Sequence, residues 1–279
     1  CSNILENFLQ DAEHFYKKNI LMSLSTYDEI IIYTYKLGYH SWKKLKTIPT
    51  RNMDTLYLPD KKKVITTIDQ FMNKEDYYRT LGIPYKLNIL LDGIPGSGKT
   101  TLVQTIASKY KMGICVLNNF SKLDDDSFID AILNMPKNTI LCIEEIETIQ
   151  LNQHKNIGFH TLLNFLDGHY SKHKCICFIT TNTKSQIDKR IVRPGRIDKT
   201  IHFKYSQKEQ IQEMFCKFYP SDKMQFERFY GKIRSHQFPM SALQTYFISY
   251  GKTFEICMRN IQKFSEFVEE TKACDGLYS

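Results

Sequence analysis

A glycine-rich octapeptide constrains this chain more than any other feature. Residues 93–100 read GIPGSGKT and match the pattern G-x-x-x-x-G-K-[ST]. An apolar run at 88–91 is expected to form a strand before it, and 99–110 is expected to form a helix after it. A chain of average composition and this length would carry such a match by chance about once in a hundred. The segment therefore predicts a phosphate-binding loop between a strand and a helix.

The chemistry of that loop follows from its residue types. Glycines let the backbone curl so that its N–H groups point at phosphate oxygens, and the following helix adds its positive end. Lys99 is expected to reach the β- and γ-phosphates, and the Thr100 hydroxyl to ligate Mg²⁺. The expected ligands are ATP and Mg²⁺. The residues expected to bind the nucleotide are Gly93, Ile94, Pro95, Gly96, Ser97, Gly98, Lys99, Thr100 and Thr101.

The rest of the middle section alternates strand and helix patterns. This alternation predicts an α/β fold in which a parallel sheet is covered by helices on both faces. After residue 206 the strand signal fades, and helical patterns predict a small helical subdomain. Besides 88–91, the expected strands are 114–117, 139–143, 174–180 and 199–203. Besides 99–110, the expected helices are 127–133 and 159–166, then 208–218, 224–232, 242–249 and 253–269.

The front section has a mixed pattern. A helical stripe at 3–18 precedes expected strands at 20–24, 29–35 and 56–58, and a single helix is expected over 64–78. This pattern indicates part of an α+β domain. We therefore expect three units: the end of that domain at 1–58, the nucleotide-binding unit at 59–205 and the helical subdomain at 206–279.

Two acids follow a buried strand of the expected sheet. Glu144 and Glu145 come directly after the apolar run 140–143. Acids at the carboxyl end of a parallel strand lie beside the phosphate loop. Glu144 is expected to hold the Mg²⁺ shell, and Glu145 to orient and polarise the attacking water. The alternative is that both acids are solvated in an ordinary turn. The phosphate loop upstream favours the metal and water roles over this alternative.

Three further polar residues are candidates for catalysis. Asn182 ends the next strand, where its amide can position water or contact the γ-phosphate, although Thr-Thr-Asn is also a good turn sequence. Arg193 and Arg196 flank a Pro-Gly turn and suit charge stabilisation on a transferring phosphoryl group. Spacing alone leaves open that both arginines belong to a basic surface loop.

Taken in order, these segments make the chain resemble the AAA ATPases. The matching features are the loop 93–100, the acids after 140–143, Asn182 as the sensor-1 residue, and the RPGRID run at 193–198. The resemblance implies an AAA P-loop NTPase sheet sandwiched by helices, with a helical subdomain after it. It also implies that Arg193 and Arg196 act as fingers in a neighbouring subunit's site, and hence a homo-oligomeric ring.

Less generic stretches are similar to one AAA branch, that of the mitochondrial Rieske iron–sulfur protein translocase. They are YY at 77–78 with GIPY at 82–85, LNFLDG at 163–168, FYP at 218–220, MSALQTYF at 240–247, and Trp42 with 51–58. The resemblance implies a protein client, a chaperone role and the matrix side of the mitochondrial inner membrane. We also expect residues upstream of Cys1, including a membrane helix.

The chain departs from the AAA pattern at three places, of which Lys189 in a position where Pro is common is the mildest. Glu144 stands where most AAA proteins have Asp, which puts the metal shell in question, while Glu145 keeps the usual catalytic length. No arginine lies around Ser241, where many AAA proteins carry a sensor-2 arginine. Arg193 and Arg196 would then carry more of the charge stabilisation.

Composition bears on several other classes of function. The formal net charge is +8, but the lysines are spread along the chain without a basic–aromatic stripe, which argues against a nucleic-acid partner. The eight cysteines show no CxxC pair and favour a reducing compartment, the cytoplasm if the mitochondrial resemblance fails. His169, His173, Cys175 and Cys177 suggest zinc, but two strand cysteines and two loop histidines explain them better.

The predicted function is an ATPase that moves or remodels a protein partner. Phe120 and Phe159 are candidates for client contact in a central channel, although packing roles are as reasonable for both. Two alternatives stay open: a nucleic-acid-dependent motor, suggested by the charge, and a nucleotide-gated ring with little hydrolysis, suggested by Glu144. A GTPase is disfavoured because no Asn-Lys-x-Asp motif follows the phosphate loop.

Overall fold

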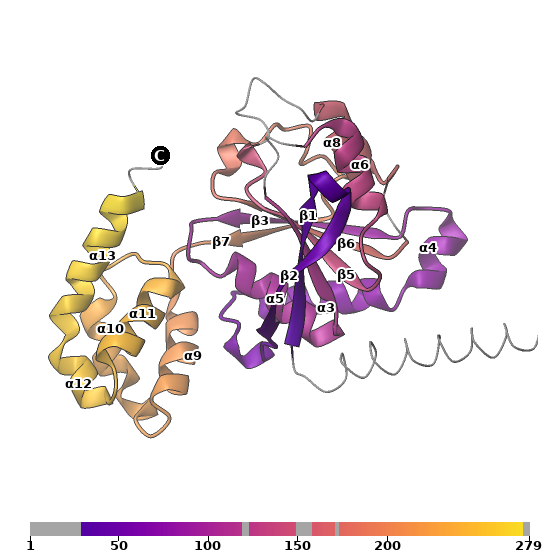
Figure 1. The fold of residues 1–279 in the computed structure, drawn as a ribbon. Coiled ribbons are helices and arrows are strands. Elements are labelled where there is room, and N and C mark those ends of the chain that lie inside the picture. The colour runs from indigo at the N-terminus through magenta and orange to yellow at the C-terminus, as the bar shows by residue number, and fades with distance from the viewer. Residues whose placement is uncertain (1–28, 119–122, 149–157, 171–172, 276–279) are drawn as a thin grey trace, which may run out of the picture.

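The computed structural model describes residues 29–118, 123–148, 158–170 and 173–275 and contains one seven-stranded sheet (Figure 1). The strand order is β2-β1-β4-β5-β6-β3-β7, and only the pair β1–β2 is antiparallel. The strands are β1 (Glu29–Lys36), β2 (Ser41–Pro49), β3 (Lys86–Gly93), β4 (Gly113–Leu117), β5 (Thr139–Ile143), β6 (Cys175–Thr181) and β7 (Lys199–Phe203).

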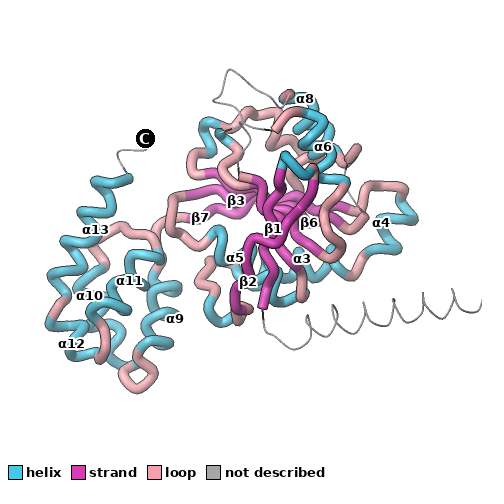
Figure 2. The backbone as a smooth tube through the Cα atoms, viewed as in Figure 1, coloured by secondary structure: helices cyan, strands magenta, loops and turns pink. Residues whose placement is uncertain are grey.

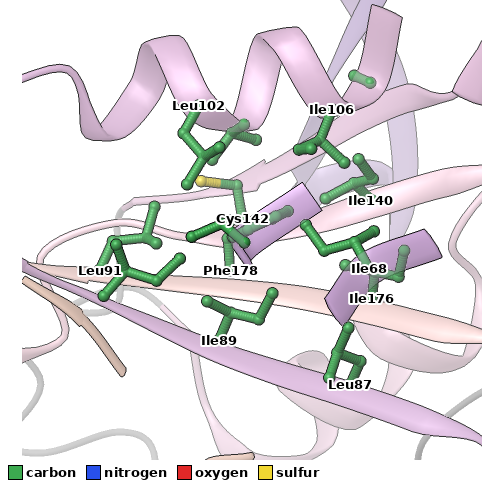
Figure 3. Close-up of a cluster of buried hydrophobic side chains, with 14 of the residues drawn as sticks. Ile68, Leu87, Ile89, Leu91, Leu102, Ile106, Ile140, Cys142, Ile176 and Phe178 are labelled. Carbon is green, nitrogen blue, oxygen red and sulfur yellow. The ribbon is translucent and has the colours of Figure 1, made fainter. Parts of the chain in front are cut away.

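Helices cover both faces of this sheet, as the alternating pattern predicts. One face packs on α3 (Lys61–Met72) and α5 (Lys99–Tyr110), and the other on α6 (Asp125–Leu133) and α8 (Phe159–Asp167). Figure 3 shows the first of these cores, in which apolar side chains of β3, β5 and β6 meet those of α3 and α5. Every residue of β5 and β6 is buried, because both faces are covered. The predicted α/β fold is confirmed.

The front section belongs to the same sheet. β1 pairs in parallel with β4, so the sheet crosses the boundary expected between residues 58 and 59, and the division into three units stays a prediction. The sequence reading missed β2, which joins β1 as an antiparallel hairpin. The strand predicted at 56–58 is wrong: Leu56 and Leu58 are buried in the α3–α5 core, but their segment pairs with no strand. The segments predicted at 3–18 and 20–24 lie outside the described residues.

Two helices predicted as single pieces are each broken. The helix predicted over 64–78 is α3 followed by α4 (Glu75–Leu81), and the Asn73 N–H closes α3 on the carbonyls of Asp69 and Phe71. The helix predicted over 253–269 is α12 (Phe254–Arg259) followed by α13 (Ile261–Asp275), with Asn260 as the cap between them. Asparagine favours such ends because its side chain competes for backbone hydrogen bonds.

The chain ends in a bundle of helices set beside the sheet domain (Figure 2). Its core is rich in aromatic rings, with Phe215 stacked on Phe229 at 5.2 Å between ring centroids. No helix in the described ranges combines the length and apolar character needed to cross a membrane. Besides α12 and α13, the bundle contains α9 (Lys208–Phe218), α10 (Phe226–Ile233) and α11 (Met240–Tyr250).

Candidate functional site

The glycine-rich loop lies where the sequence predicts it, between β3 and α5. Its glycines take backbone angles that other residues rarely adopt, with φ of 145° at Gly93, 71° at Gly96 and 104° at Gly98. Gly93 pairs with Phe203 of β7, and a Cβ at Gly93 would lie 1.9 Å from the Phe203 carbonyl oxygen. The loop therefore depends on glycine both for its curvature and for its approach to the neighbouring strand.

Replacing Gly93 by alanine should lower the free energy of unfolding by roughly 2–5 kcal/mol, because it combines a strained backbone with an overpacked contact. Gly82→Ala is the matched control, since Gly82 also has positive φ (65°) but has no atom within 4 Å of an added Cβ. Chemical denaturation of both variants measures the difference. Equal losses in the two variants would contradict the close approach of Gly93 to β7.

The Lys99 ammonium sits at the centre of the site. It donates to the carbonyl oxygens of Gly93 and Ile94 and to the Asn182 amide oxygen, the last at 2.8 Å. Burial lowers the pKa of Lys99, and the charges of Glu147, Asp92 and Glu145 oppose that shift. All three ammonium protons have acceptors, and phosphate oxygens are acceptors of the same kind.

Glu145 and Asn182 meet beside this lysine. The Asn182 amide nitrogen lies 3.5 Å from a Glu145 carboxylate oxygen, while its oxygen accepts from Lys99. Glu145 has a left-handed backbone (φ 53°), and its N–H donates to the Thr180 hydroxyl at 3.0 Å. Positive φ is uncommon for a residue other than glycine and tends to occur at functional positions. The sequence-predicted pair is thus brought together, with the Glu145 carboxylate exposed towards the cavity.

Glu144 and Thr100 line the same cavity and supply oxygen donors, the class that Mg²⁺ prefers. Burial raises the pKa of Glu144, the Glu145 charge raises it further, and a hydrogen bond from Asn118 lowers it. A bound cation would relieve this burial and repulsion by favouring the ionised carboxylate. The residues present therefore fit a magnesium ion held by one hydroxyl and one carboxylate.

Sequence reasoning missed a third acid, Glu147. Glu147 is 7% exposed, and one of its carboxylate oxygens accepts the Asn182 N–H at 2.9 Å. The other carboxylate oxygen has no hydrogen-bond partner among the described residues. Glu147 thus holds the backbone of Asn182 in place through this hydrogen bond. The signal was present in the sequence as a third acid in the run Glu-Glu-Ile-Glu.

The two arginines lie away from the loop of their own chain, and neither lines its cavity. Arg193 is exposed, and its side chain makes no hydrogen bond or ion pair with the residues that the structure describes. Arg196 is half-buried and donates to both carboxylate oxygens of Asp167, at 2.8 and 3.0 Å. The two arginines, which sequence spacing does not distinguish, therefore have different environments in the structure.

A cavity of about 1070 Å³ joins the loop to two other parts of the chain. Residues 50–52 and 55–57 line part of it, and α9 and α11 line another part through residues that include Met214, Phe218 and Ser241. The Ser241 N–H donates to the Gly96 carbonyl at 3.1 Å, so the helical bundle contacts the phosphate loop directly. The volume suffices for a whole nucleotide.

The remaining candidates do not form a second site in the described residues. Cys175 and Cys177 are buried free thiols in β6, His169 and His173 are exposed, and no group of three or more His, Cys, Asp or Glu there is placed to hold a metal. Phe159 is partly buried, with the Arg190 guanidinium 4.3 Å from its ring centroid. Phe120 lies outside the described residues.

Comparison with known protein families finds two matches in this chain. Residues 89–205 match the family described as "ATPase family associated with various cellular activities (AAA)". Residues 208–263 match "Mitochondrial chaperone BCS1-like, ATPase lid domain". The first match covers the phosphate loop, the acids and both arginines, and the second covers most of the helical bundle.

Individual similar proteins are also named as BCS1 chaperones. A "probable mitochondrial chaperone BCS1-A" of Dictyostelium discoideum is 33% identical over 235 residues, which are 78% of this chain and 56% of that protein. A "probable mitochondrial chaperone bcs1" of Schizosaccharomyces pombe is 36% identical over 168 residues, 57% of this chain and 37% of that one. The human "mitochondrial chaperone BCS1" is 28% identical over 204 residues, 67% and 49%. The chain spans about half the length of the first and third of these relatives.

Proposed function

The chain belongs to the AAA ATPases and carries a BCS1-like lid, and on that basis we propose that it hydrolyses Mg-ATP at the subunit interfaces of a homo-oligomeric ring. The observation that carries the proposal is the geometry around Lys99, where Asn182 bridges the lysine and Glu145 and all three line a nucleotide-sized cavity. Neither arginine lines the cavity of its own chain, so an arginine that stabilises the phosphates would come from a neighbouring subunit.

Each residue has a defined task in this mechanism. The loop N–H groups and Lys99 bind the phosphates, with phosphate oxygens as alternative acceptors for the ammonium. Thr100 and Glu144 would hold Mg²⁺, which neutralises phosphate charge when bound. Glu145 accepts a proton from the attacking water, and Asn182 orients that water. An arginine from the neighbouring subunit stabilises charge on the transferring group.

Steady-state phosphate release with Mg-ATP tests the proposal, and absence of turnover in the assembled chain would contradict it. Binding without multiple turnover would instead support a nucleotide-gated ring, which the Glu144 departure suggests. Single-turnover kinetics separates these two outcomes, because a ring that binds ATP with little hydrolysis would release phosphate slowly even in its first cycle. Stimulation by DNA or RNA would point to a nucleic-acid-dependent motor, the reading that the net charge of +8 suggests.

The client and the cellular location are extensions of the same proposal. The relatives are called mitochondrial chaperones, which supports a protein client and a mitochondrial location. The matrix side of the inner membrane is proposed from the family resemblance alone. ATP-driven remodelling of a Rieske-type client would follow from the branch. Location of the tagged chain in the source cell tests the compartment, and co-purification with the nucleotide-trapped ring tests the client.

Lys99→Ala should abolish stabilisation by Mg-ATP. The wild-type chain at a hundred times the Kd should gain about 2.7 kcal/mol, which thermal unfolding with and without nucleotide measures. Lys109→Ala is the matched control, because Lys109 lies near the other end of the same helix and outside the cavity. It should keep the full nucleotide-induced shift. An equal shift in Lys99→Ala would remove this lysine from the phosphate site.

A further inference from the structure

The turn that carries the two arginines is fastened to its own subunit at several points. The Asn88 side-chain amide donates to the Arg196 carbonyl at 2.7 Å, and the Lys86 ammonium donates to the Gly195 carbonyl at 2.8 Å. Asp198 accepts the Asn88 N–H at 2.7 Å and returns its own N–H to the Asn88 carbonyl at 2.9 Å. Asn88 and Lys86 are both buried in β3. Strand β3 therefore fixes the backbone of the turn.

The Arg196 side chain is part of this fastening. Its guanidinium forms two parallel hydrogen bonds with Asp167, the last residue of α8, and a third at 2.8 Å with the Arg190 carbonyl. The Arg196 side chain is 19% exposed. Bidentate arginine–carboxylate pairs are among the stronger and more directional polar contacts in proteins. These bonds use three of the five guanidinium donors, and Arg196 would have to break all three to turn away from Asp167.

Arg193 is in the opposite situation. It opens the same turn, since the N–H groups of Arg196 and Ile197 both donate to the Arg193 carbonyl. Its side chain is exposed and has no hydrogen-bond or ion-pair partner within the described ranges. Its guanidinium therefore keeps all of its donors available for an anion.

We infer that the two arginines have different roles. Arg196 is a positioning residue that its ion pair with Asp167 holds within its own subunit, and Arg193 alone is presented to the neighbouring subunit's phosphates. Asp167 thereby becomes a second positioning residue, outside the cavity of its own chain. This inference rests on the proposed function. It differs from the default reading of the resemblance, in which both arginines contact the phosphate.

The test compares Arg196→Ala with Asp167→Ala in the assembled full chain, by kcat and KM for ATP. A misplacement of about 1 Å costs on the order of 10²-fold in rate, so each variant should lose roughly that factor in kcat with little change in KM. The double variant should lose no more than either single one, because the same contact is removed. Arg196→Lys should recover only part of the loss, since an ammonium cannot form the bidentate contact.

The opposite result has a distinct signature. If Arg196 itself stabilises the phosphate, Asp167→Ala frees it and leaves kcat at the wild-type level or above, while Arg196→Ala loses about 10³–10⁵-fold. That pair of outcomes would overturn the inference. Arg79→Ala is the matched control, since Arg79 forms an exposed ion pair with Asp76 on α4 and should leave kcat unchanged.

Amide hydrogen exchange of residues 193–198 supplies a readout that needs no turnover. Exchange should rise in Arg196→Ala and Asp167→Ala and stay at the wild-type level in Arg193→Ala. Unchanged exchange in Asp167→Ala would overturn the positioning role of Asp167 even in a catalytically active ring. Conversely, a wild-type chain that binds ATP without hydrolysing it would overturn the proposed function and the catalytic half of the inference, while exchange still decides the positioning role. If Asp167→Ala does not fold, Asp167→Asn replaces it in both measurements.

Discussion

Replacing Arg193 by alanine should lower the ATP turnover of the assembled chain by about 10³–10⁵-fold, the factor associated with loss of an arginine finger. The reason is electrostatic: charge develops on the transferring phosphoryl group, and a preorganised cation lowers the energy of that state more than that of bound ATP. ATP binding by the variant should persist, because Arg193 does not line the cavity of its own chain. Phosphate release at saturating Mg-ATP measures the rate, and sedimentation confirms assembly.

Mixed assemblies show whether Arg193 acts across an interface. Arg193→Ala subunits keep an intact Glu145, and Glu145→Gln subunits keep an intact Arg193. An interface that pairs the first subunit's nucleotide site with the second subunit's arginine has every required group. Mixing the two inactive variants should therefore restore part of the turnover. No recovery in mixed rings of confirmed composition would place Arg193 in its own subunit's site and contradict the shared active site.

The second large effect is expected for Glu145→Gln, which should reduce kcat by about 10²–10⁴-fold. The amide keeps the size of the side chain but cannot accept a proton from water. Glu145 lies beside Asn182 and close enough to Lys99 for its charge to act on that lysine's pKa. Binding of ATP should be retained, so the variant should trap the nucleotide. Pre-steady-state phosphate release measures the chemical step directly.

Glu144→Gln is the matched control for this substitution, because it makes the same chemical change one residue earlier. Glu144 is placed to hold Mg²⁺, so its loss should raise the Mg²⁺ concentration needed for half-maximal rate. Glu145→Gln should leave that concentration unchanged and lower the rate at saturating Mg²⁺. Full turnover by Glu145→Gln would contradict its role as the base, and an unchanged Mg²⁺ requirement in Glu144→Gln would remove Glu144 from the metal shell.

Local sequence predicted most of the sheet domain because its strands are buried on both faces. Continuous apolar runs such as 139–143 and 175–181 satisfy that environment and few others. The edge strand β2 was missed because its sequence, SWKKLKTIP, is mostly polar and exposed. An edge strand pairs on one side and faces water, so its residues carry a weaker apolar signal. The segment 56–58 failed for the reverse reason: it is apolar and buried without a partner strand.

In the candidate site, too, some residues could be predicted from local sequence and others could not. The phosphate loop, Glu144 and Glu145 could be assigned from sequence because each lies at a defined step after a strand, and backbone geometry then fixes its place. Glu147 is separated by 35 residues from the Asn182 N–H that it accepts, and spacing gave no reason to connect them. Its burial is a property of the packed sheet.

By itself, the sequence determined that this chain forms a parallel sheet with a phosphate loop, two acids and two arginines. Those features depend on residue type and short-range spacing, which fix local backbone geometry. Only the tertiary structure decided how the arginines differ. Arg196 meets Asp167 across 29 residues of sequence, whereas Arg193, three positions earlier, remains exposed. The position of α8 relative to β3 decides which of the two guanidinium groups pairs with a carboxylate. That position is set by packing of the whole domain.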